Sequence, residues 1–505
     1  MRGRKLKLHS YTISRLEKLS RKKRIICFGS GNNLTHLFDA MRDFRMEERI
    51  SYIVDNDPQK WGKSRRVNGL SIPIENPEKL RTENWGCNLL LVTIVQYQAV
   101  LRQLDELLEG TKAKCVISPA YRYWYDQIID RLTKRQSIQN TIVLQGEGDT
   151  CENAKALIRE FRKYADYRKY RIAWLYDGES RSNDRQKSER CLLRELPLKR
   201  HTIRQMYEYS TYINRAKYQI YENKMIPKAR REQIACYMNH GTPLKSTKGK
   251  IIVYKDTDYV LSPSESAAAI ICEQYEARKN QILICGAPRT DCLLAEDSNR
   301  KLAEELHLER YERMILWAPT FRVHENYSRR DSEKKFRFGV PLLERETDYQ
   351  AVFEILKEKN VLLVIKPHIH EEASELTLSE ADHIRIVKQE LLDRLDSNVY
   401  ELMKLSDALI TDYSSIAFDY MLLNRPIGYT IDDMEQYTIG FSVPDPLAYM
   451  TGMKMKTCAE LSHFIVSVAA GRDDYKEERE KLRDRMHIYQ DGGNSKRLLE
   501  LLELI

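Results

Sequence analysis

One pattern recurs through the C-terminal half of the chain: a short apolar run leads directly into a polar turn. The clearest example is Ala408-Leu409-Ile410, which is followed by Thr411-Asp412-Tyr413-Ser414-Ser415. Similar runs at 282–285, 313–317 and 360–365 end in turns that carry Arg or His. Short apolar runs are typical of buried parallel strands, whose following turns meet at one edge of the sheet. The pattern therefore predicts an open α/β sheet with a ligand site at that edge.

The polar turn at 411–415 precedes a stretch in which apolar residues recur at helical spacing. A helix N-terminus exposes unpaired backbone N–H groups and the positive end of the helix dipole. Ser414 and Ser415 add hydroxyl donors at that point, so the turn can bind a phosphate without a metal. The alternative is that one of the two serines only caps the helix. The turn by itself supports both interpretations.

A histidine follows the predicted strand at 233–239, in the sequence His240-Gly241-Thr242-Pro243-Leu244-Lys245. A side chain at a strand end is well placed for a cleft, and a glycine beside it lets the backbone approach a ligand closely. An imidazole can accept a proton from a hydroxyl near neutral pH. His240 is therefore a candidate general base, although a lone histidine is more often structural.

The N-terminal part carries a second ligand-type pattern. An apolar run at 25–28 precedes Gly29-Ser30-Gly31, and the next apolar run, at 51–54, ends at Asp55. Glycines at the first turn and an acid after the second strand follow the order of a dinucleotide-binding fold. Gly29, Gly31 and Asp55 are accordingly candidate cofactor contacts. Leu34 stands where the third glycine belongs, so a Rossmann-like scaffold without a nucleotide is the favoured interpretation.

Length and composition narrow the remaining choices. A chain of 505 residues indicates about three domains of ~150 residues each, and we expect them at 1–120, 121–270 and 271–505. The sequence has no apolar run of about 18 residues and no signal peptide, which predicts a cytoplasmic protein. The 10 cysteines include no CxxC pair, so neither a zinc site nor a disulfide framework is expected.

The net charge of +9 arises from 83 basic and 74 acidic residues. This modest excess favours an anionic substrate or an anionic membrane surface over a nucleic acid. Arg, Lys and Tyr are concentrated at 159–171 and 206–231. Such stretches suit a lipid headgroup boundary, although plain exposed helix ends are the more common explanation.

The polar turns together resemble those of one known family. The chain resembles the CDP-glycerol glycerophosphotransferases, which are teichoic-acid primases and polymerases, in HGTPLK at 240–245, GAPRTD at 286–291, APTFR at 318–322, KPH at 366–368, TDYSSIAFDY at 411–420 and DGG…SKR at 491–497. The resemblance covers residues 140–505. It implies an α/β protein with a GT-B-type pair of Rossmann-like domains, to which the N-terminal segment adds another Rossmann-like domain. It also implies that an acceptor hydroxyl attacks the β-phosphate of CDP-glycerol and that CMP leaves.

The resemblance assigns roles to single residues. His240 is the expected base, and Arg322 and His368 are expected to neutralise the phosphates. Asp419 is expected to bind a glycerol or ribose hydroxyl, or to support the turn. Arg289 and Asp291 are interpreted as mainly structural, because they can pair locally. The expected substrate contacts are Gly241, Thr242, Lys245, Thr411, Asp412, Ser414, Ser415 and Asp419.

The expected donor is CDP-glycerol, with no cofactor and no metal, because no acidic cluster for a metal is evident. The acceptor is expected to be lipid-linked or polymeric, at the inner face of the cell membrane, and a homo-oligomer is left open. Met238-Asn239 and Ile369 depart from the family pattern, in which Trp precedes the histidine and Pro follows KPH. CDP-ribitol or another CDP-alditol is therefore an alternative donor. A GT-B glycosyltransferase that uses a nucleotide sugar and a non-catalytic scaffold are alternative functions.

Overall fold

The computed structural model describes most of the chain. The described residues are 8–10, 13–31, 34, 38, 41, 46–67, 69–94, 98–117, 128–146, 152–176, 194–197, 203–223, 225–296, 299–320, 322–324, 329–332, 334, 336–367 and 380–505. The chain divides into two compact units. The first unit comprises Met1–Gln139 with Glu195–Ala216, and the second comprises Asn140–Arg194 with Lys217–Ile505.

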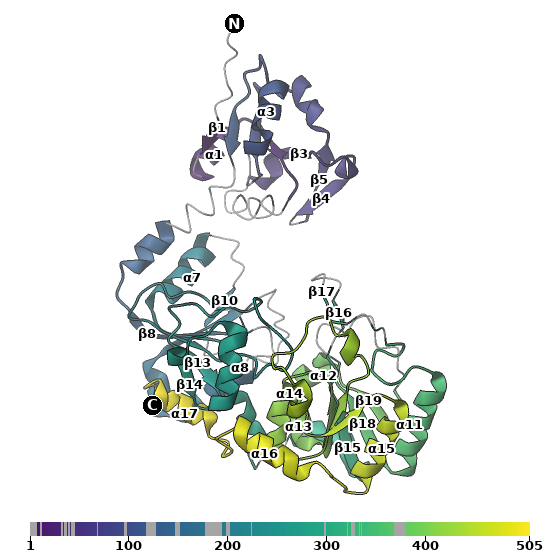
Figure 1. Ribbon diagram of the computed structural model, residues 1–505. Helices are drawn as coiled ribbons and strands as arrows, with labels where there is room; N and C mark the ends of the chain where they lie inside the picture. Colours follow the sequence, from purple (N-terminus) through teal and green to yellow (C-terminus); the bar gives the residue numbers. More distant parts are fainter. Residues whose placement is uncertain are drawn as a thin grey trace. The chain divides into compact units, whose positions relative to one another are not determined.

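The first unit is built on a largely parallel sheet (Figure 1). Its strand order is β1-β7-β6-β2-β3-β5-β4, in which the β4–β5 pair is antiparallel and the other pairs are parallel. The strands are β1 (Leu8–Ser10), β2 (Arg24–Phe28), β3 (Ile50–Val54), β4 (Ser64–Val67), β5 (Leu70–Glu75), β6 (Asn88–Val92) and β7 (Cys115–Ile117). Helix α1 (Ile13–Ser20) packs on one face and α3 (Gln98–Leu107) on the other, because apolar side chains alternate along the strands. The strands predicted at 25–28 and 51–54 are confirmed.

The segment Glu195–Ala216 carries most of β10 (Arg194–Pro197) and the whole of helix α7 (Ile203–Arg215). Near the end of α7, Asn214 donates from Nδ2 to Oδ1 of Asp130 at 2.9 Å and to Oγ1 of Thr133 at 2.7 Å. Asp130 and Thr133 lie in the helical residues 128–134. These helical residues therefore pack against the end of α7.

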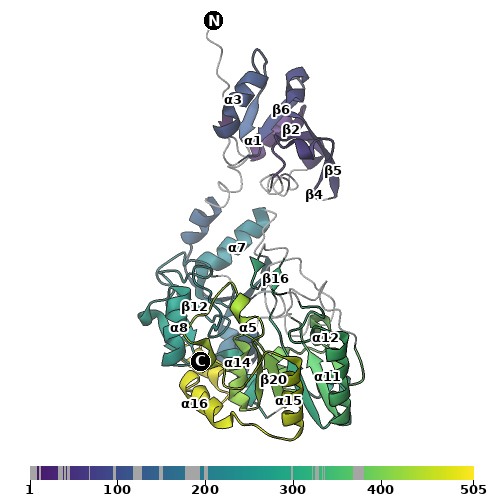
Figure 2. The ribbon, with the colours of Figure 1, turned by 45° about the vertical axis from the view of Figure 1, so that its right-hand side comes forward.

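The second unit contains two large sheets and one short two-stranded sheet. In the first of them, six neighbouring strands run in the order β9-β8-β11-β12-β13-β14. They are β8 (Gln139–Gln145), β9 (Arg171–Tyr176), β11 (Ala216–Tyr221), β12 (Ile234–Tyr237), β13 (Tyr259–Ser262) and β14 (Ile282–Ile284). Helix α8 (Glu265–Tyr275) packs on one face. Helices α5 (Glu152–Phe161) and α17 (Asn494–Leu501) share the core of the other face, so the C-terminus returns to this sheet (Figure 1, Figure 2).

The other large sheet of the second unit is wholly parallel, in the order β19-β18-β15-β20-β21-β22. Its strands are β15 (Arg313–Trp317), β18 (Val361–Ile365), β19 (Ile384–Ile386), β20 (Ala408–Thr411), β21 (Ile427–Thr430) and β22 (Met453–Met455). Helices α11 (Glu346–Glu358) and α15 (Cys458–Ala469) cover one face. Helices α13 (Val399–Leu405) and α14 (Ile416–Tyr420) cover the other. The strands predicted at 282–285, 313–317, 360–365 and 408–410 are thus confirmed, and all pair in parallel.

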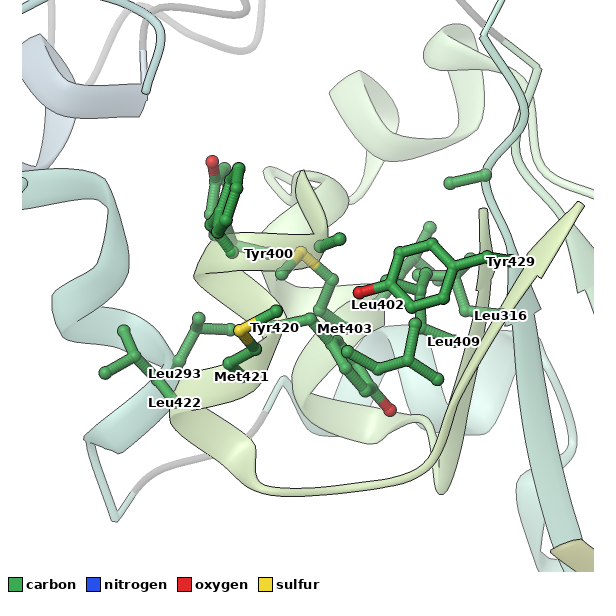
Figure 3. Packing of buried hydrophobic residues seen from close by; sticks show 14 of the residues in the cluster. Leu293, Leu316, Tyr400, Leu402, Met403, Leu409, Tyr420, Met421, Leu422 and Tyr429 are labelled. Atoms are coloured by element: carbon green, nitrogen blue, oxygen red, sulfur yellow. The ribbon is translucent and has the colours of Figure 1, made fainter. Parts of the chain in front are cut away.

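A continuous apolar core supports the strand ends that carry the polar turns. Figure 3 shows Leu316, Leu409 and Tyr429 of the sheet packed against side chains from α13 and from the segment around α14. Leu293, from the short helix α9 (Asp291–Leu294), belongs to the same cluster. This core fixes β20 and α14 on either side of the turn at 411–415.

Two sequence expectations differ from the structure. The boundary expected at 270 does not separate the two large sheets. Beyond it, β14 is still a strand of the sheet that contains β8, and α17 packs on that sheet. The helix predicted after Ser415 has 5 residues and continues as one 3₁₀ turn, Met421–Leu423, so its dipole is smaller than expected. The remaining helices of the second unit include α10 (Arg300–Glu305), α12 (Gln389–Arg394) and α16 (Lys476–Met486), and β16 (Val323–His324) pairs with β17 (Arg329–Arg330). Among the described helices, none is both long and apolar enough to cross a membrane.

Candidate functional site

His240 lies three residues beyond the end of β12, between two residues with left-handed backbone conformations. Asn239 has φ +49° and Gly241 has φ +111°. The Asn239 side chain fixes this turn, since its Oδ1 accepts from the Gly241 N–H at 2.8 Å and its Nδ2 donates to the Leu261 carbonyl at 2.7 Å. The turn presents the His240 side chain to solvent.

The surroundings of His240 keep its imidazole neutral. The protein atoms beside the exposed ring reduce its solvation, and this effect together with the positive charge of Arg289 lowers the pKa to about 4. Nδ2 of Asn223 lies 3.0 Å from Nε2 of His240. With the amide in this orientation, Nε2 is the unprotonated nitrogen. His240 can therefore accept a proton at neutral pH, as expected of a base.

The histidine turn faces the serine turn. A Cβ atom added to Gly241 would lie 3.6 Å from Oγ of Ser415 and 2.8 Å from Nη2 of Arg289. A backbone hydrogen bond beyond the histidine turn stabilises this arrangement. In it, the N–H of Ser442 donates to the Leu244 carbonyl at 2.9 Å. Two segments that are far apart in the sequence, 240–246 and 411–415, are thereby brought together within the second unit.

The expected contacts beside His240 have different surroundings. Gly241 and Thr242 are both buried, and Gly241 faces Ser415. Lys245 forms a β-bridge with Phe441, and the N–H of the next residue, Ser246, donates to the Gly440 carbonyl at 3.0 Å. The backbone at Lys245 thus belongs to the connection between the two sheets.

The residues of the serine turn divide into two groups. Ser414 and Ser415 are partly exposed, and Oγ of Ser414 accepts from the Ile416 N–H at 3.4 Å, which is a long capping contact. Thr411 and Asp412 are fully buried. Oγ1 of Thr411 donates to the Ala318 carbonyl at 2.8 Å, and Oδ2 of Asp412 accepts from the backbone N–H and Oγ1 of Thr320. The expectation that Thr411 and Asp412 contact substrate is therefore corrected: their side chains hold the turn from beneath.

Arg322 also points into the protein rather than toward a ligand. Its Nη1 lies 2.7 Å from Oδ2 of Asp412, and its Nε lies 2.6 Å from Oδ2 of Asp433. Burial opposes the charge of the guanidinium, but the two carboxylates outweigh this effect and raise the pKa of Arg322. The rings of Tyr413 and Tyr437 flank the guanidinium at 5.4 and 5.6 Å. The structure thus makes Arg322 a buried support of the turns, not the expected phosphate ligand.

Asp419 likewise forms a buried ion pair, with Arg289. Its carboxylate accepts from Nε and Nη2 of Arg289 at 2.9 and 3.2 Å and from the hydroxyl of Tyr400 at 2.8 Å. The second expected role of Asp419, support of the turn, fits this geometry. The local pair expected between Arg289 and Asp291 is wrong, because Asp291 instead accepts from the N–H groups of Asn494 and Ser495 at the start of α17.

Sequence reasoning missed the position of Arg289. It is buried, yet it reaches Gly241 and influences His240, so it belongs to the site. The signal that could have indicated this was its place in a polar turn after a strand, the same position that singled out His240. His368, the third expected catalytic residue, lies outside the described residues.

In the glycine turn of the first unit, Ser30 is hydrogen-bonded to Asp55. Oδ2 of Asp55 accepts from the Ser30 N–H at 2.8 Å and also from the Ser30 hydroxyl, and Lys60 lies 3.5 Å away. Burial opposes ionisation of Asp55, but the hydrogen bonds from Ser30 prevail and lower its pKa. Gly29 has φ +106° and Gly31 has open space at its Cα. Cofactor contacts at Gly29, Gly31 and Asp55 stay a prediction, while the carboxylate performs a structural role that the scaffold interpretation anticipates.

Within the described residues, no three His, Cys, Asp or Glu side chains are grouped so that they could hold a metal ion. Reaction without a metal stays a prediction.

Known proteins similar to this chain are named for the transfer of alditol phosphates or for teichoic acid synthesis. The family profile described as CDP-Glycerol:Poly(glycerophosphate) glycerophosphotransferase matches residues 130–504. A teichoic acid ribitol-phosphate primase of Bacillus spizizenii is 27% identical over 259 residues, which are 50% of this chain and 60% of that protein. A teichoic acid glycerol-phosphate primase of Bacillus subtilis is 29% identical over 252 residues, which are 50% of this chain and 58% of that protein.

One group of solved structures shares the fold. The wall teichoic acid polymerase TagF matches with a TM-score of 0.57 at 19% identity, over 75% of this chain and 92% of that one. The chain spans about 60% of the length of the two primases that it matches.

Proposed function

The chain belongs to the CDP-glycerol:poly(glycerophosphate) glycerophosphotransferase family, and from this membership we propose that it transfers glycerol phosphate from CDP-glycerol to an acceptor hydroxyl and releases CMP. The observation that carries the proposal is the approach of the His240–Gly241 turn to Ser415. A neutral imidazole and exposed hydroxyl donors from two different sheets meet there. This pairing of a base with anion-holding donors is what phosphoryl transfer to a hydroxyl requires.

The proposed reaction needs one proton transfer and one displacement. The acceptor hydroxyl gives its proton to Nε2 of His240 while its oxygen bonds to the β-phosphorus of the donor. The bond between that phosphorus and the bridging oxygen breaks, and the electron pair leaves with CMP. Ser414 and Ser415 hold the diphosphate through hydroxyl and backbone N–H donors. For Nε2 to act, the amide of Asn223 gives up its position 3.0 Å from that nitrogen to the acceptor hydroxyl.

A second donor is supported by a specific observation. The relative that covers 50% of this chain at 27% identity is a ribitol-phosphate primase, and Met238-Asn239 precede His240 where the family pattern has Trp. CDP-ribitol is therefore the alternative donor in our proposal. A nucleotide-sugar glycosyltransferase is set aside, since the matching family profile extends over residues 130–504.

The cellular setting belongs to the same proposal. We assign the two sheets of the second unit to the halves of a GT-B-type enzyme, and the first unit to a Rossmann-like scaffold. The enzyme acts without a metal or cofactor on a lipid-linked or polymeric acceptor at the inner membrane face. The net charge of +9 supports attraction to an anionic surface, and Tyr207 on α7 is one exposed aromatic side chain in a basic, tyrosine-rich segment.

The test is an assay of CMP release by the full chain. CDP-glycerol and CDP-ribitol are each offered with a lipid-linked disaccharide and with a glycerol-phosphate oligomer, with and without EDTA. The proposal expects acceptor-dependent CMP release from one CDP-alditol that survives EDTA. Binding and turnover of a UDP-sugar in place of both CDP-alditols would overturn it.

A further inference from the structure

We propose that Asn153 and Arg289 form a positioning bridge, which aligns the His240 turn with the Ser414–Ser415 turn; the catalytic meaning of this bridge rests on the function proposed above. Neither residue was among the expected substrate contacts. Both are buried, and both contact groups from more than one part of the site.

The first half of the bridge is the side chain of Asn153, at the start of α5. Its Nδ2 donates to the carbonyl of Asn239 at 3.0 Å and to Oε1 of Glu222, also at 3.0 Å. Its Oδ1 accepts from the Arg289 N–H at 3.1 Å. Since Asn239 is the residue before His240, Asn153 ties the backbone of the histidine turn directly to the backbone at Arg289.

The second half is the guanidinium of Arg289. It forms a two-bond pair with Asp419, and the Tyr400 hydroxyl lies 2.8 Å from Nε. Asp419 lies in α14, one helical turn beyond Ser415, so its position fixes the helix that begins after the serine turn. Figure 3 shows Tyr400 at the border of the apolar cluster that supports α14. The bridge thus runs without a gap from Asn239 to α14.

The same guanidinium also lies against the turn that it positions. Its Nη2 would be 2.8 Å from a Cβ on Gly241, so only a glycine leaves it room. On the other side, the Tyr275 hydroxyl donates to the Gly241 carbonyl at 3.2 Å. A change of the guanidinium therefore alters both the place of the turn and the electric field at its histidine.

The charges around the bridge are those of Arg289, Asp419, Glu222 and Glu152. Burial raises the pKa of both glutamates to about 7, and Glu222 accepts from the Asn153 and Ala154 N–H groups. Loss of solvation and, to a smaller extent, the charge of Arg289 lower the pKa of His240 to about 4. A bound diphosphate is an anion and opposes that effect, so the base becomes stronger once the donor is in place. The bridge thereby links proton uptake by His240 to donor binding.

A purely structural role of Arg289 is the alternative, because buried ion pairs support folds without taking part in chemistry. The two roles predict different effects of Arg289 substitutions on the titration of His240. A structural residue changes the melting temperature alone, whereas a positioning residue also changes the titration of His240 and kcat.

The experiment uses the full chain with ¹³C-labelled histidine and follows each imidazole by NMR as the pH changes, with His240→Gln to assign the His240 signal. Arg289→Gln is expected to shift the pKa of His240 upward from about 4 toward 6.5. Arg289→Lys keeps the charge but loses the forked pair with Asp419. It should leave that pKa low and still reduce kcat for CMP release by about 100-fold, with a smaller change in KM.

Arg479→Gln is the matched control, since Arg479 is fully buried and paired with Asp473 in the same unit. It should lower the melting temperature and leave the titration of His240 unchanged. The proposal is overturned if both Arg289 variants fold and if the titration of His240 and kcat both remain as in the wild type. If the wild type releases no CMP from any donor, the proposed function fails, and the His240 titration alone decides whether the bridge exists.

Discussion

Two hydrogen bonds join the guanidinium of Arg322 to the carboxylate of Asp433, from Nε to Oδ2 at 2.6 Å and from Nη2 to Oδ1 at 3.2 Å. The third edge of the guanidinium faces Asp412, with Nη1 2.7 Å from Oδ2. The three residues follow β15, β20 and β21, which are neighbours in one sheet. The polar turns of these strands are therefore locked together by buried charges beneath the partly exposed serines.

This arrangement predicts a large loss of stability on Arg322→Met, because two buried carboxylates would lose their cation. The expected cost is about 3–5 kcal/mol in the free energy of unfolding, measured by denaturant titration. Arg345→Met is the control: Arg345 pairs with Asp348, its side chain is 77% exposed, and because solvent screens this pair its loss should cost far less stability than the loss of Arg322. Equal effects of the two substitutions would contradict a structural role for Arg322.

Gly241→Ala should damage the site more than backbone strain alone explains. The residue has φ +111°, and its new Cβ would press on Nη2 of Arg289. Gly249→Ala is the matched control, since Gly249 has φ +74° and its Cβ would meet no described atom within 4 Å. We expect both to lose stability and Gly241→Ala alone to lose most CMP release. Full activity of Gly241→Ala would show that the two turns do not need their close approach.

The activity should depend on pH through His240 with a definite sign. The neutral imidazole is the competent form, so kcat/KM should fall as the pH drops through about 4, the pKa of His240 in the free enzyme. In the donor complex the diphosphate raises that pKa, so the acid limb of kcat should lie at higher pH. Profiles of CMP release at low and at saturating donor measure both limbs. An acid limb of kcat below that of kcat/KM would contradict this prediction.

Ser415→Ala should weaken donor binding without removing the base. A hydroxyl that donates to a charged group contributes about 1.5–3 kcal/mol, so the dissociation constant of CDP-glycerol should rise by about 10-fold or more. Calorimetric titration measures it directly. Ser467→Ala, a partly buried serine on α15, serves as control and should bind the donor normally. Normal binding by Ser415→Ala would remove this serine from the donor site.

The strands were predictable because their signal is local. The runs at 314–317 and 408–410 are apolar throughout, and both are buried parts of strands in the structure. The roles of the polar residues after them were not predictable in the same way. Arg289 and Asp419 are 130 positions apart in sequence, and Arg322 and Asp433 are 111 apart. A charged residue in a turn suits a ligand and an ion pair equally well, and only the fold determines which it meets.

The measurement that tests the central claim most directly compares CMP release from CDP-glycerol by the wild type, His240→Ala and His463→Ala. His463 is an exposed histidine on α15, remote in sequence from the two turns, and serves as the matched control. The account predicts acceptor-dependent release by the wild type and His463→Ala, and a loss of about 100- to 10,000-fold in His240→Ala while the donor still binds. Undiminished release by a folded His240→Ala protein would contradict it.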